Sequence, residues 1–394
     1  MLMKLNFLFL ILLFFANSPG FAQEDPYKKF SVNGYISNMQ SVMTDKLDGN
    51  WISDNLFHNR LNASWYPSKN ATFTIQLRNR LMYGETVKYF PSYAEAIDED
   101  NGFIDLSMNI LNEKSFFLNT TIDRIHFQLT KGKLVTTVGR QRINWGISSV
   151  WNPNDIFNVQ NYFDFDYIEK PGSDAVRLQY YTGISSSAEI AAKLNRDKNL
   201  TLAGIYRFTA GGYDLQFLGG ILEDDDYVAG FGWSGDIKNV GFKGEMSYFL
   251  PVKNTKDTSG IYLITVGADY MFSNSLFAQL EVLYSKLPEG YSIFDFASWY
   301  QGTLNVKNLS FTDLSFFGSL SYPITPLLNI NTAGMYFPDL KGFFAGPSID
   351  YSLTDNMQFS IITQVFSGEL PDLLTRQRKR NNLYLGFVRY KINF

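Results

Sequence analysis

The side chains most often used in catalysis and metal binding are scarce in this chain. His58 and His126 are the only histidines, and there is no cysteine. Each histidine falls in a β-like run, another run separates them, and no third ligand for a zinc ion is paired with them. No nucleophile motif accompanies His126, as hydrolysis would require. We therefore predict no catalytic residue, no metal site and no cofactor, and a protein that is not an enzyme.

Three short motifs have plain explanations. GFGWSG at 230–235 has the spacing of a dinucleotide-binding loop. Such a loop cradles phosphate only where a helix follows, whereas here a β-like run continues, so we interpret the glycines as strand residues. The acidic EDDD at 223–226 suits a solvated loop tip better than a weak cation site. The basic RQRKR at 376–380 suits either solubility or binding of an anionic surface polysaccharide.

The stretch VGRQRINWGISSVWNPNDIF, at 138–157, is the stronger chemical signal. Arg140 and Arg142 flank a glutamine at the end of a β-like run, and two tryptophans follow without a helical period. Guanidinium groups pair well with carboxylate and amide oxygens. The two arginines therefore suit anionic or amide partners, supplied by the protein itself or by a solute.

The beginning of the chain predicts export. Lys4 is the only charge before a largely apolar run from 5 to 15, and small residues follow up to Ala22. This pattern is typical of a secretory signal peptide. We expect a signal peptide at 1–22, a short periplasmic segment at 23–29 and one domain at 30–394. A membrane anchor would need a longer apolar run, and no later segment has 18 consecutive apolar residues.

The composition of the chain favours strands with one apolar and one polar face. Aromatic residues make up 16% of the chain and charged residues 18%, while the mean hydropathy is only −0.13. Without cysteine there is no disulfide, no thiolate metal site and no lipoprotein anchor. The net charge of −4 gives no indication of nucleic-acid binding.

Period-two alternation is the dominant pattern along the chain. At 261–272 one face carries Tyr262, Ile264, Val266, Ala268, Tyr270 and Phe272. Similar alternation recurs near 72–81, 199–209, 238–250, 275–285, 309–322 and 341–351. Each segment is about ten residues long, which is the length of a tilted strand that crosses a bilayer. The pattern predicts an all-β fold, a transmembrane antiparallel β-barrel.

The connections between these segments alternate in length. Short turn-like links are PSKN, TKGK, TGIS, AGG, IKN, FSNS, PITP and LTDN, and the longer links include 84–118, 143–173, 251–259, 288–308 and 368–379. Outer-membrane barrels have short periplasmic turns and longer outer loops. The count gives about eighteen strands, an even number that leaves both ends of the barrel on the periplasmic side. The last segment, LYLGFVRYKINF, ends on Phe394 and resembles the C-terminal strand by which such barrels are recognised for insertion.

Because the lipid face must be apolar, alternation also predicts which residues face inward. One arc is cationic: His58, Arg60, Asn62, Arg78, Arg80, Arg124, His126, Gln128, Arg140, Arg142, Asn144, Arg177, Gln179, Arg389 and Lys391. The opposite arc carries Asp214, Glu245, Asp269, Glu281, Asp313 and Asp350, with Lys243. Buried charges without partners would cost several kcal/mol each. We therefore expect the two arcs to face each other across water, in a barrel wide enough for a channel.

The loop at 143–173 is too apolar for a freely solvated tip, and we expect it to fold into the lumen. It would bury its aromatic residues and bring Asn152, Asn154 and Asp155 toward the arginines. The loop is then either a constriction or a structural plug, and the sequence leaves both open. The residues predicted to line the lumen or constriction are Arg60, Arg78, Arg80, Arg124, Arg140, Arg142, Asn144, Trp145, Trp151, Asn152, Asp155 and Arg177.

GRQRINWG, WNPNDIF and EKPGSDAVRLQYY resemble porin-like outer-membrane barrels of Gram-negative bacteria. Within these, the chain resembles a Bacteroidetes-type group that is distantly similar to alginate-export porins. The motifs cover roughly 100–182, and for alginate export only the Gly-Arg-Gln run and the basic lumen correspond. The resemblance implies an outer-membrane channel and names no solute.

The leading hypothesis is a porin-like channel for small hydrophilic, anionic solutes in the cell outer membrane. Its expected partners are outer-membrane lipid, lipopolysaccharide and the solutes, and no nucleic acid. A homo-oligomer and envelope-complex partners both stay open. The alternative is a barrel subunit of an envelope assembly or secretion complex, with its lumen plugged by the 143–173 loop.

Overall fold

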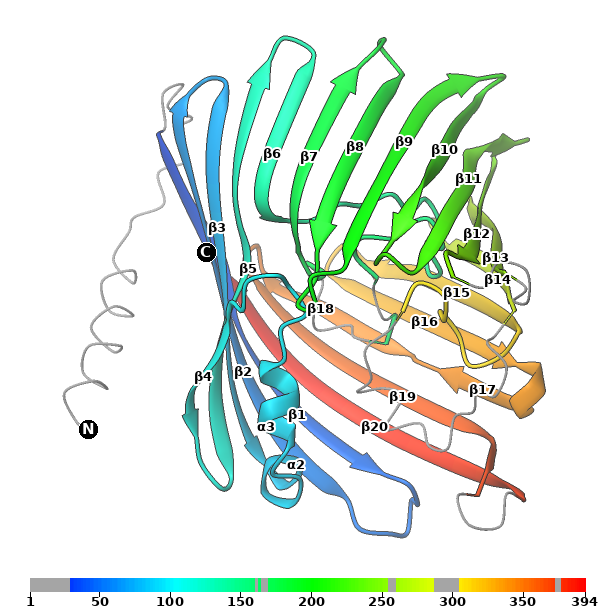
Figure 1. The fold of residues 1–394 in the computed structure, drawn as a ribbon. Coiled ribbons are helices and arrows are strands. Elements are labelled where there is room, and N and C mark those ends of the chain that lie inside the picture. The colour runs from blue at the N-terminus through cyan, green and yellow to red at the C-terminus, as the bar shows by residue number, and fades with distance from the viewer. Residues whose placement is uncertain (1–28, 160–161, 164–168, 254–259, 287–304, 373–376) are drawn as a thin grey trace, which may run out of the picture.

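The computed structural model is a closed antiparallel β-barrel (Figure 1). The structure describes residues 29–159, 162–163, 169–253, 260–286, 305–372 and 377–394. The predicted signal peptide and most of the segment after it lie outside the described residues. No helix in the described part of the chain is long and apolar enough to cross a membrane.

Twenty strands form one sheet. They are β1 (Phe30–Thr44), β2 (Ile52–Ser68), β3 (Ala71–Gly84), β4 (Ser107–Asn112), β5 (Phe116–Lys131), β6 (Leu134–Gln141), β7 (Ser173–Tyr181), β8 (Ser187–Leu194), β9 (Leu200–Ala210), β10 (Tyr213–Leu222), β11 (Asp226–Ile237), β12 (Val240–Pro251), β13 (Ile261–Met271), β14 (Phe277–Ser285), β15 (Leu314–Thr325), β16 (Leu328–Phe337), β17 (Gly342–Ala345), β18 (Ser348–Thr354), β19 (Met357–Pro371) and β20 (Arg378–Asn393).

These strands occupy eighteen positions in the barrel wall, since two positions are each shared by two short strands. β4 and β6 pair with different parts of the same β5 strand, and β17 and β18 both lie between β16 and β19. The barrel closes where β1 pairs with β20. The predicted fold and the expected number of about eighteen strands are therefore confirmed for the described residues.

The predicted asymmetry of the two barrel ends is confirmed as well. At one end, tight hairpins join strand pairs such as β9–β10 and β11–β12 (Figure 1, top). Their central residues have positive φ, 62° and 82° at Gly211 and Gly212 and 50° and 71° at Lys238 and Asn239. Two positive φ angles give a turn whose twist matches that of the strands. The other end carries the long connections, with α2 (Glu85–Tyr89), α3 (Tyr93–Asp98) and the short helix η1 (Pro338–Leu340).

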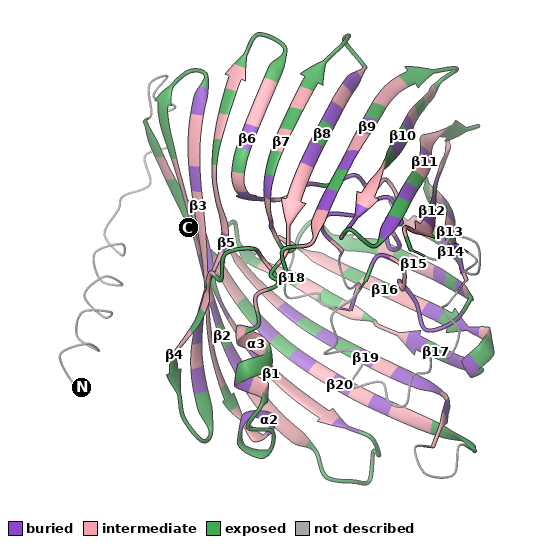
Figure 2. Cartoon of the chain, in the orientation of Figure 1, coloured by how far each residue is buried: buried purple, intermediate pink, exposed green. Residues whose placement is uncertain are grey.

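Exposed and buried residues alternate along the strands, as the period of two requires (Figure 2). On β7 the apolar side chains of Val176, Leu178 and Tyr180 are exposed on the outer face, while Ala175 is buried. An apolar outer face and a polar inner face are the surfaces of a barrel that spans a bilayer. The buried apolar residues instead gather inside the barrel, around the loop that enters it.

The alternation breaks at Asp123. The pairing between β3 and β5 shifts register there, so Gln76 faces Arg124 and Leu77 faces Ile122. This β-bulge turns the Asp123 side chain into the barrel, where it is buried. Arg124, the next residue, also faces inward. A strict alternation through β5 would have placed this carboxylate in lipid.

Candidate functional site

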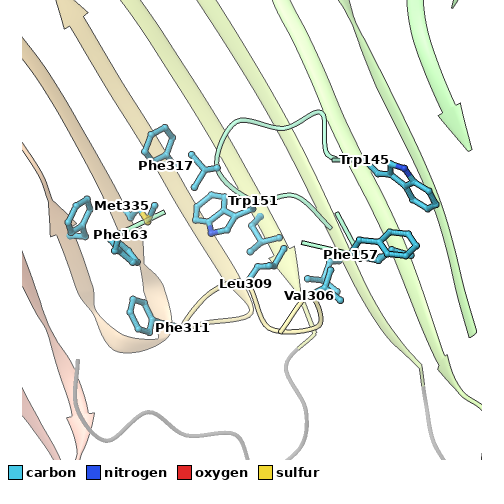
Figure 3. Close-up of a cluster of buried hydrophobic side chains, with 14 of the residues drawn as sticks. Trp145, Trp151, Phe157, Phe163, Val306, Leu309, Phe311, Phe317 and Met335 are labelled. Atoms are coloured by element: carbon cyan, nitrogen blue, oxygen red, sulfur yellow. The ribbon is translucent and has the colours of Figure 1, made fainter. Parts of the chain in front are cut away.

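The connection from β6 to β7, residues 142–172, enters the barrel as predicted. Trp145 is 1% exposed and Trp151 4% exposed. The Trp145 ring meets Phe157 edge to face at 4.8 Å, and Trp151 meets Phe317 of the barrel wall at 6.4 Å. Figure 3 shows these side chains with Val306, Leu309 and Phe311 of the connection between β14 and β15. Two long connections therefore form an apolar core inside the barrel.

Two wall carboxylates hold the first half of this loop. Glu245 of β12 accepts hydrogen bonds from the backbone N–H groups of Ile147, Ser148 and Asn154. Glu281 of β14 accepts those of the three residues 149–151, at 2.8–3.3 Å. Neither carboxylate has an ion pair among the described residues, and both are at most 1% exposed. The loop backbone therefore supplies the hydrogen bonds that these buried charges need.

This arrangement corrects the expectation that the loop would bring Asn152 and Asn154 toward the arginines, whereas Asp155 does lie near enough to Arg142 to interact with it electrostatically. Asn154 instead donates to the carbonyl of Phe231 and accepts from Ser247 Oγ at 2.7 Å, both on the acidic side of the barrel. Among the described residues, the Asn152 side chain hydrogen-bonds within its own loop, donating to the carbonyl of Val150 at 3.5 Å. Asp155 accepts the backbone N–H of Trp145 at 3.2 Å.

The reason is that Glu245 and Glu281, on the acidic side of the barrel, need hydrogen-bond donors. Glu245 and Glu281 would be buried without partners if the loop turned toward the cationic side. At the level of Glu245 and Glu281 the two arcs therefore do not face each other across open water, because the loop lies over these two carboxylates. That part of the prediction was wrong.

The far end of the loop returns to the cationic side. Glu169 accepts a hydrogen bond from the Tyr35 hydroxyl at 3.3 Å and lies 3.6 Å from Arg60 Nε. Arg124 Nη2 donates to the backbone carbonyls of Glu169 and Lys170. The loop thus contacts β12 and β14 on one side of the lumen and β1, β2 and β5 on the other, and it crosses the barrel interior.

Much of the predicted cationic arc is neutralised by carboxylates. Arg60 is fully buried and pairs with Asp123, which Arg78 also approaches at 3.3 Å. Arg140 lies 2.6 Å from Asp100 and 2.7 Å from Asp174. Arg140 is therefore a structural ion-pair partner and not an open cation of the wall, contrary to the prediction.

Other cations of this region are only partly buried. Arg142 is half-buried and donates only to Asn144, at 3.1 Å, and neither Arg142 nor Arg177 has an ion pair among the described residues. Arg80 donates to Asn119 at 2.8 Å and to a backbone carbonyl of α3. On the neighbouring wall Arg207 lies 3.6 Å from Glu189.

Several carboxylates that decide this charge pattern were missed by sequence reasoning. Asp100 and Glu169 lie in long connections, and Asp174 follows the start of β7. None of them has a sequence signal that points to an arginine. Asp123 did have one, because two adjacent charged residues, Asp123 and Arg124, cannot both face inward on a regular strand. Such a pair predicts a bulge.

A cavity of about 530 Å³ lies on the long-loop side of the barrel. Its walls carry Arg78, Arg80, Arg140, Lys193 and Arg196 together with Glu99, Asp100, Asp123, Asp174, Asp197 and Glu223. Five cations thus stand among six carboxylates, so the cavity is not simply positive. In the described part of the chain, no cluster of three or more His, Asp or Glu side chains is placed to hold a metal ion.

Known structures share the fold of this barrel. OccAB3 from Acinetobacter baumannii superposes with a TM-score of 0.58 at 11% identity, over 93% of this chain and 99% of that one. OccAB4 from the same organism gives a TM-score of 0.55 at 11% identity, over 94% and 100%. The outer membrane protein OprD from Pseudomonas aeruginosa gives 0.57 at 10% identity, over 93% and 94%. No family model and no curated protein matches the sequence.

The fold defines the class: the described residues form a porin-like β-barrel, with eighteen wall positions and a loop inside the barrel. The structures that it resembles are those of the Occ and OprD proteins. A Bacteroidetes origin and a similarity to alginate-export porins stay predictions.

Proposed function

We propose that the chain is a channel for small hydrophilic, anionic solutes in the cell outer membrane, surrounded by lipid and lipopolysaccharide. The loop at 142–172 forms its constriction. The observation that carries the charge preference is the pair Arg142 and Arg177, two inward cations without an ion pair among the described residues. Arg177 is on β7 and Arg142 is the first loop residue after β6, whereas the carboxylates that the loop covers are on β12 and β14.

The preference follows from electrostatics. An anion about 4 Å from one guanidinium gains about 1 kcal/mol in bulk-like water and about 4 kcal/mol at an effective dielectric of about 20. Arg140 contributes little, because Asp100 and Asp174 already neutralise it. Glu245 and Glu281, whose charges would repel an anion, are screened by the loop backbone that they bind.

The test is the ion selectivity of the purified protein in planar bilayers. Arg142→Gln with Arg177→Gln should shift the reversal potential under a salt gradient toward cations, and more at low salt than at high salt. The matched control is Lys46→Gln with Lys379→Gln, which removes the same charge from exposed positions at the long-loop end. An unchanged reversal potential in the arginine variant of a conducting protein would refute the proposed constriction.

A second candidate function is a plugged barrel subunit of an envelope assembly or secretion complex. The dense fixation of the loop favours it, since six backbone N–H groups are bound by two wall carboxylates. The wild-type protein would then fail to conduct in bilayers, and a partner would copurify with it after mild solubilisation.

A further inference from the structure

A second cavity, of about 440 Å³, lies on the short-turn side of the barrel against β14–β20. Many of its wall residues come from the strand halves nearest the turns, including Phe277 at the start of β14 and Asn331 near the start of β16. It shares no lining residue with the cavity on the long-loop side. Arg142 and Arg177 are not among its lining residues either.

The floor of this cavity is a hydrogen-bonded network of Ser321, Asn331, Asp350 and Ser360. Asp350 accepts from Asn331 Nδ2 at 3.0 Å and from Ser360 Oγ at 2.6 Å. Ser321 Oγ in turn donates to Asn331 Oδ1 at 2.6 Å. Asp350 has no ion pair among the described residues, so neutral side chains hold its carboxylate in place. The floor therefore presents fixed donors and acceptors with little freedom left to lose on binding a ligand.

Gln364 of β19 adds an acceptor that the protein does not use. The side chain is 4% exposed and lines the cavity, and its Oε1 has no hydrogen-bond partner among the described residues. Leaving a buried acceptor unsatisfied costs free energy, and such groups are rare in folded proteins. A ligand hydroxyl in the cavity would satisfy it.

The remaining lining is aromatic and aliphatic. Tyr162 comes from the 142–172 loop and is packed edge to face against Phe317 at 5.2 Å and Phe344 at 6.4 Å. Phe277 and Ile362 complete this surface. Rings held by their neighbours in this way offer a rigid apolar surface beside the polar floor.

We propose that this cavity binds a neutral polyhydroxylated solute, a mono- or disaccharide, on the short-turn side of the constriction. Sugar hydroxyls both donate and accept, which matches Asp350, Gln364, Ser319 and Asn331, and the C–H faces of a sugar ring match Tyr162. A simple anion gains little, because the positive Arg389 and the negative Asp350 both line the cavity. An apolar ligand would leave the Gln364 acceptor unsatisfied. The volume is within the range of small-molecule sites.

Calorimetric titration of the full-length protein in detergent tests this inference without requiring conduction. Maltose and glucose should each give saturable heat. Gln364→Leu should weaken their binding about tenfold or more, because a sugar hydroxyl loses its hydrogen bond to Gln364 Oε1. The same variant should fold at least as well as the wild type, since it removes a buried unsatisfied atom. The control is Thr363→Val, the outward-facing neighbour on the same strand.

Ser319→Ala provides a second variant in the same cavity and should also weaken sugar binding. The inference is overturned if neither sugar binds, if Gln364→Leu and Ser319→Ala bind both sugars as the wild type does, or if butyrate binds in the cavity and the sugars do not. Because Gln364→Leu removes no charge, it should leave the reversal potential unchanged. Loss of sugar binding and loss of anion preference are therefore separate results.

Discussion

At the residue scale, the fate of each arginine depends on carboxylates that lie elsewhere in the chain. Arg140 and Arg142 are two residues apart, and alternation assigns them to the same face. Asp100 and Asp174 neutralise the first, whereas the second has no ion pair among the described residues. Arg60, near the centre of the predicted arc, is buried completely against Asp123. The number of inward arginines therefore overstates the charge that a solute would meet.

The pair formed by Arg60 and Asp123 leads to a prediction about stability. Asp123→Asn leaves a guanidinium buried without its strongest partner, which should destabilise the barrel by about 3–5 kcal/mol. Urea unfolding in detergent measures the change. Asp45→Asn, at an exposed position, should change the stability by less than about 0.5 kcal/mol. Equal unfolding midpoints for Asp123→Asn and the wild type would contradict the buried ion pair.

Asp155 leads to a prediction about pH. Its burial raises the pKa of the carboxyl from its usual 3.8 to about 7, against smaller opposing effects of the Trp145 N–H, Lys170 and Arg142. Between about pH 4 and 7 the folded state binds a proton that the unfolded state does not, so the stability of the loop falls as pH rises through this window.

Asp155→Asn should remove that dependence. At pH 8 the variant should protect the amides near Trp145 from hydrogen exchange better than the wild type, and at pH 5 the two proteins should be alike. Comparing them at each pH cancels the intrinsic effect of pH on exchange. A difference of the same size at both values would show that Asp155 does not titrate in this window.

At the scale of elements, the loop at 142–172 is positioned by the walls more than by its own sequence. Its first half contains no helix or strand, and its backbone N–H groups are satisfied by Glu245 and Glu281. Its aromatic residues pack against wall residues such as Phe317 and Phe344. The loop is therefore a separate layer inside the barrel, fastened at two places on the acidic wall.

Glu245→Gln with Glu281→Gln should loosen this layer. Hydrogen bonds to charged acceptors contribute about 1.5–3 kcal/mol each and neutral ones about 0.5–1.5. The amides of 147–151 should then exchange about tenfold faster or more, and single-channel conductance should rise if the loop forms the constriction. Asp269→Asn is the control, because Asp269 pairs with Lys243 on the same wall at 3.0 Å. Unchanged exchange in the double variant would mean that the apolar packing alone holds the loop.

At the scale of the whole molecule, closure of the barrel depends on the first and last strands. The backbones of Gly34 and Phe394 exchange two hydrogen bonds, at 2.9 and 3.0 Å, where the first and last strands meet. The Phe394 side chain is 51% exposed on the barrel surface. The last residue thus completes the pairing that leaves the sheet without an open edge.

Removal of Phe394, or Phe394→Asp, should impair assembly while leaving export across the inner membrane intact. The charge would lie on the exposed apolar surface, and deletion would remove the terminal pair of hydrogen bonds. Heat-modifiable migration of the outer-membrane fraction on gels measures the folded barrel. Phe394→Tyr should assemble normally. Wild-type levels of folded barrel in the Phe394→Asp variant would contradict this role of the last strand.

The sequence alone determined the barrel, a number of about eighteen strands and the two kinds of end, because each rests on a local pattern. Alternation on a strand such as β13 and turn residues such as Gly211 and Gly212 act over a few neighbouring residues. The burial of Trp145 and Trp151 was likewise predictable, since an apolar loop at the mouth of a barrel can remove its side chains from water by folding into the lumen.

Only the tertiary structure decided which charges remain open. The partners of Arg140 are 34 and 40 positions away in the chain, and those of the loop N–H groups are 91 to 132 positions away. No local pattern encodes such distances. The bulge at Asp123 places one carboxylate on the inner face of the barrel. The first half of the loop lies against the acidic wall because its N–H groups bind the carboxylates there. Neutralisation of buried charge is a property of the assembled interior, because a partner exists only once distant strands have been brought side by side.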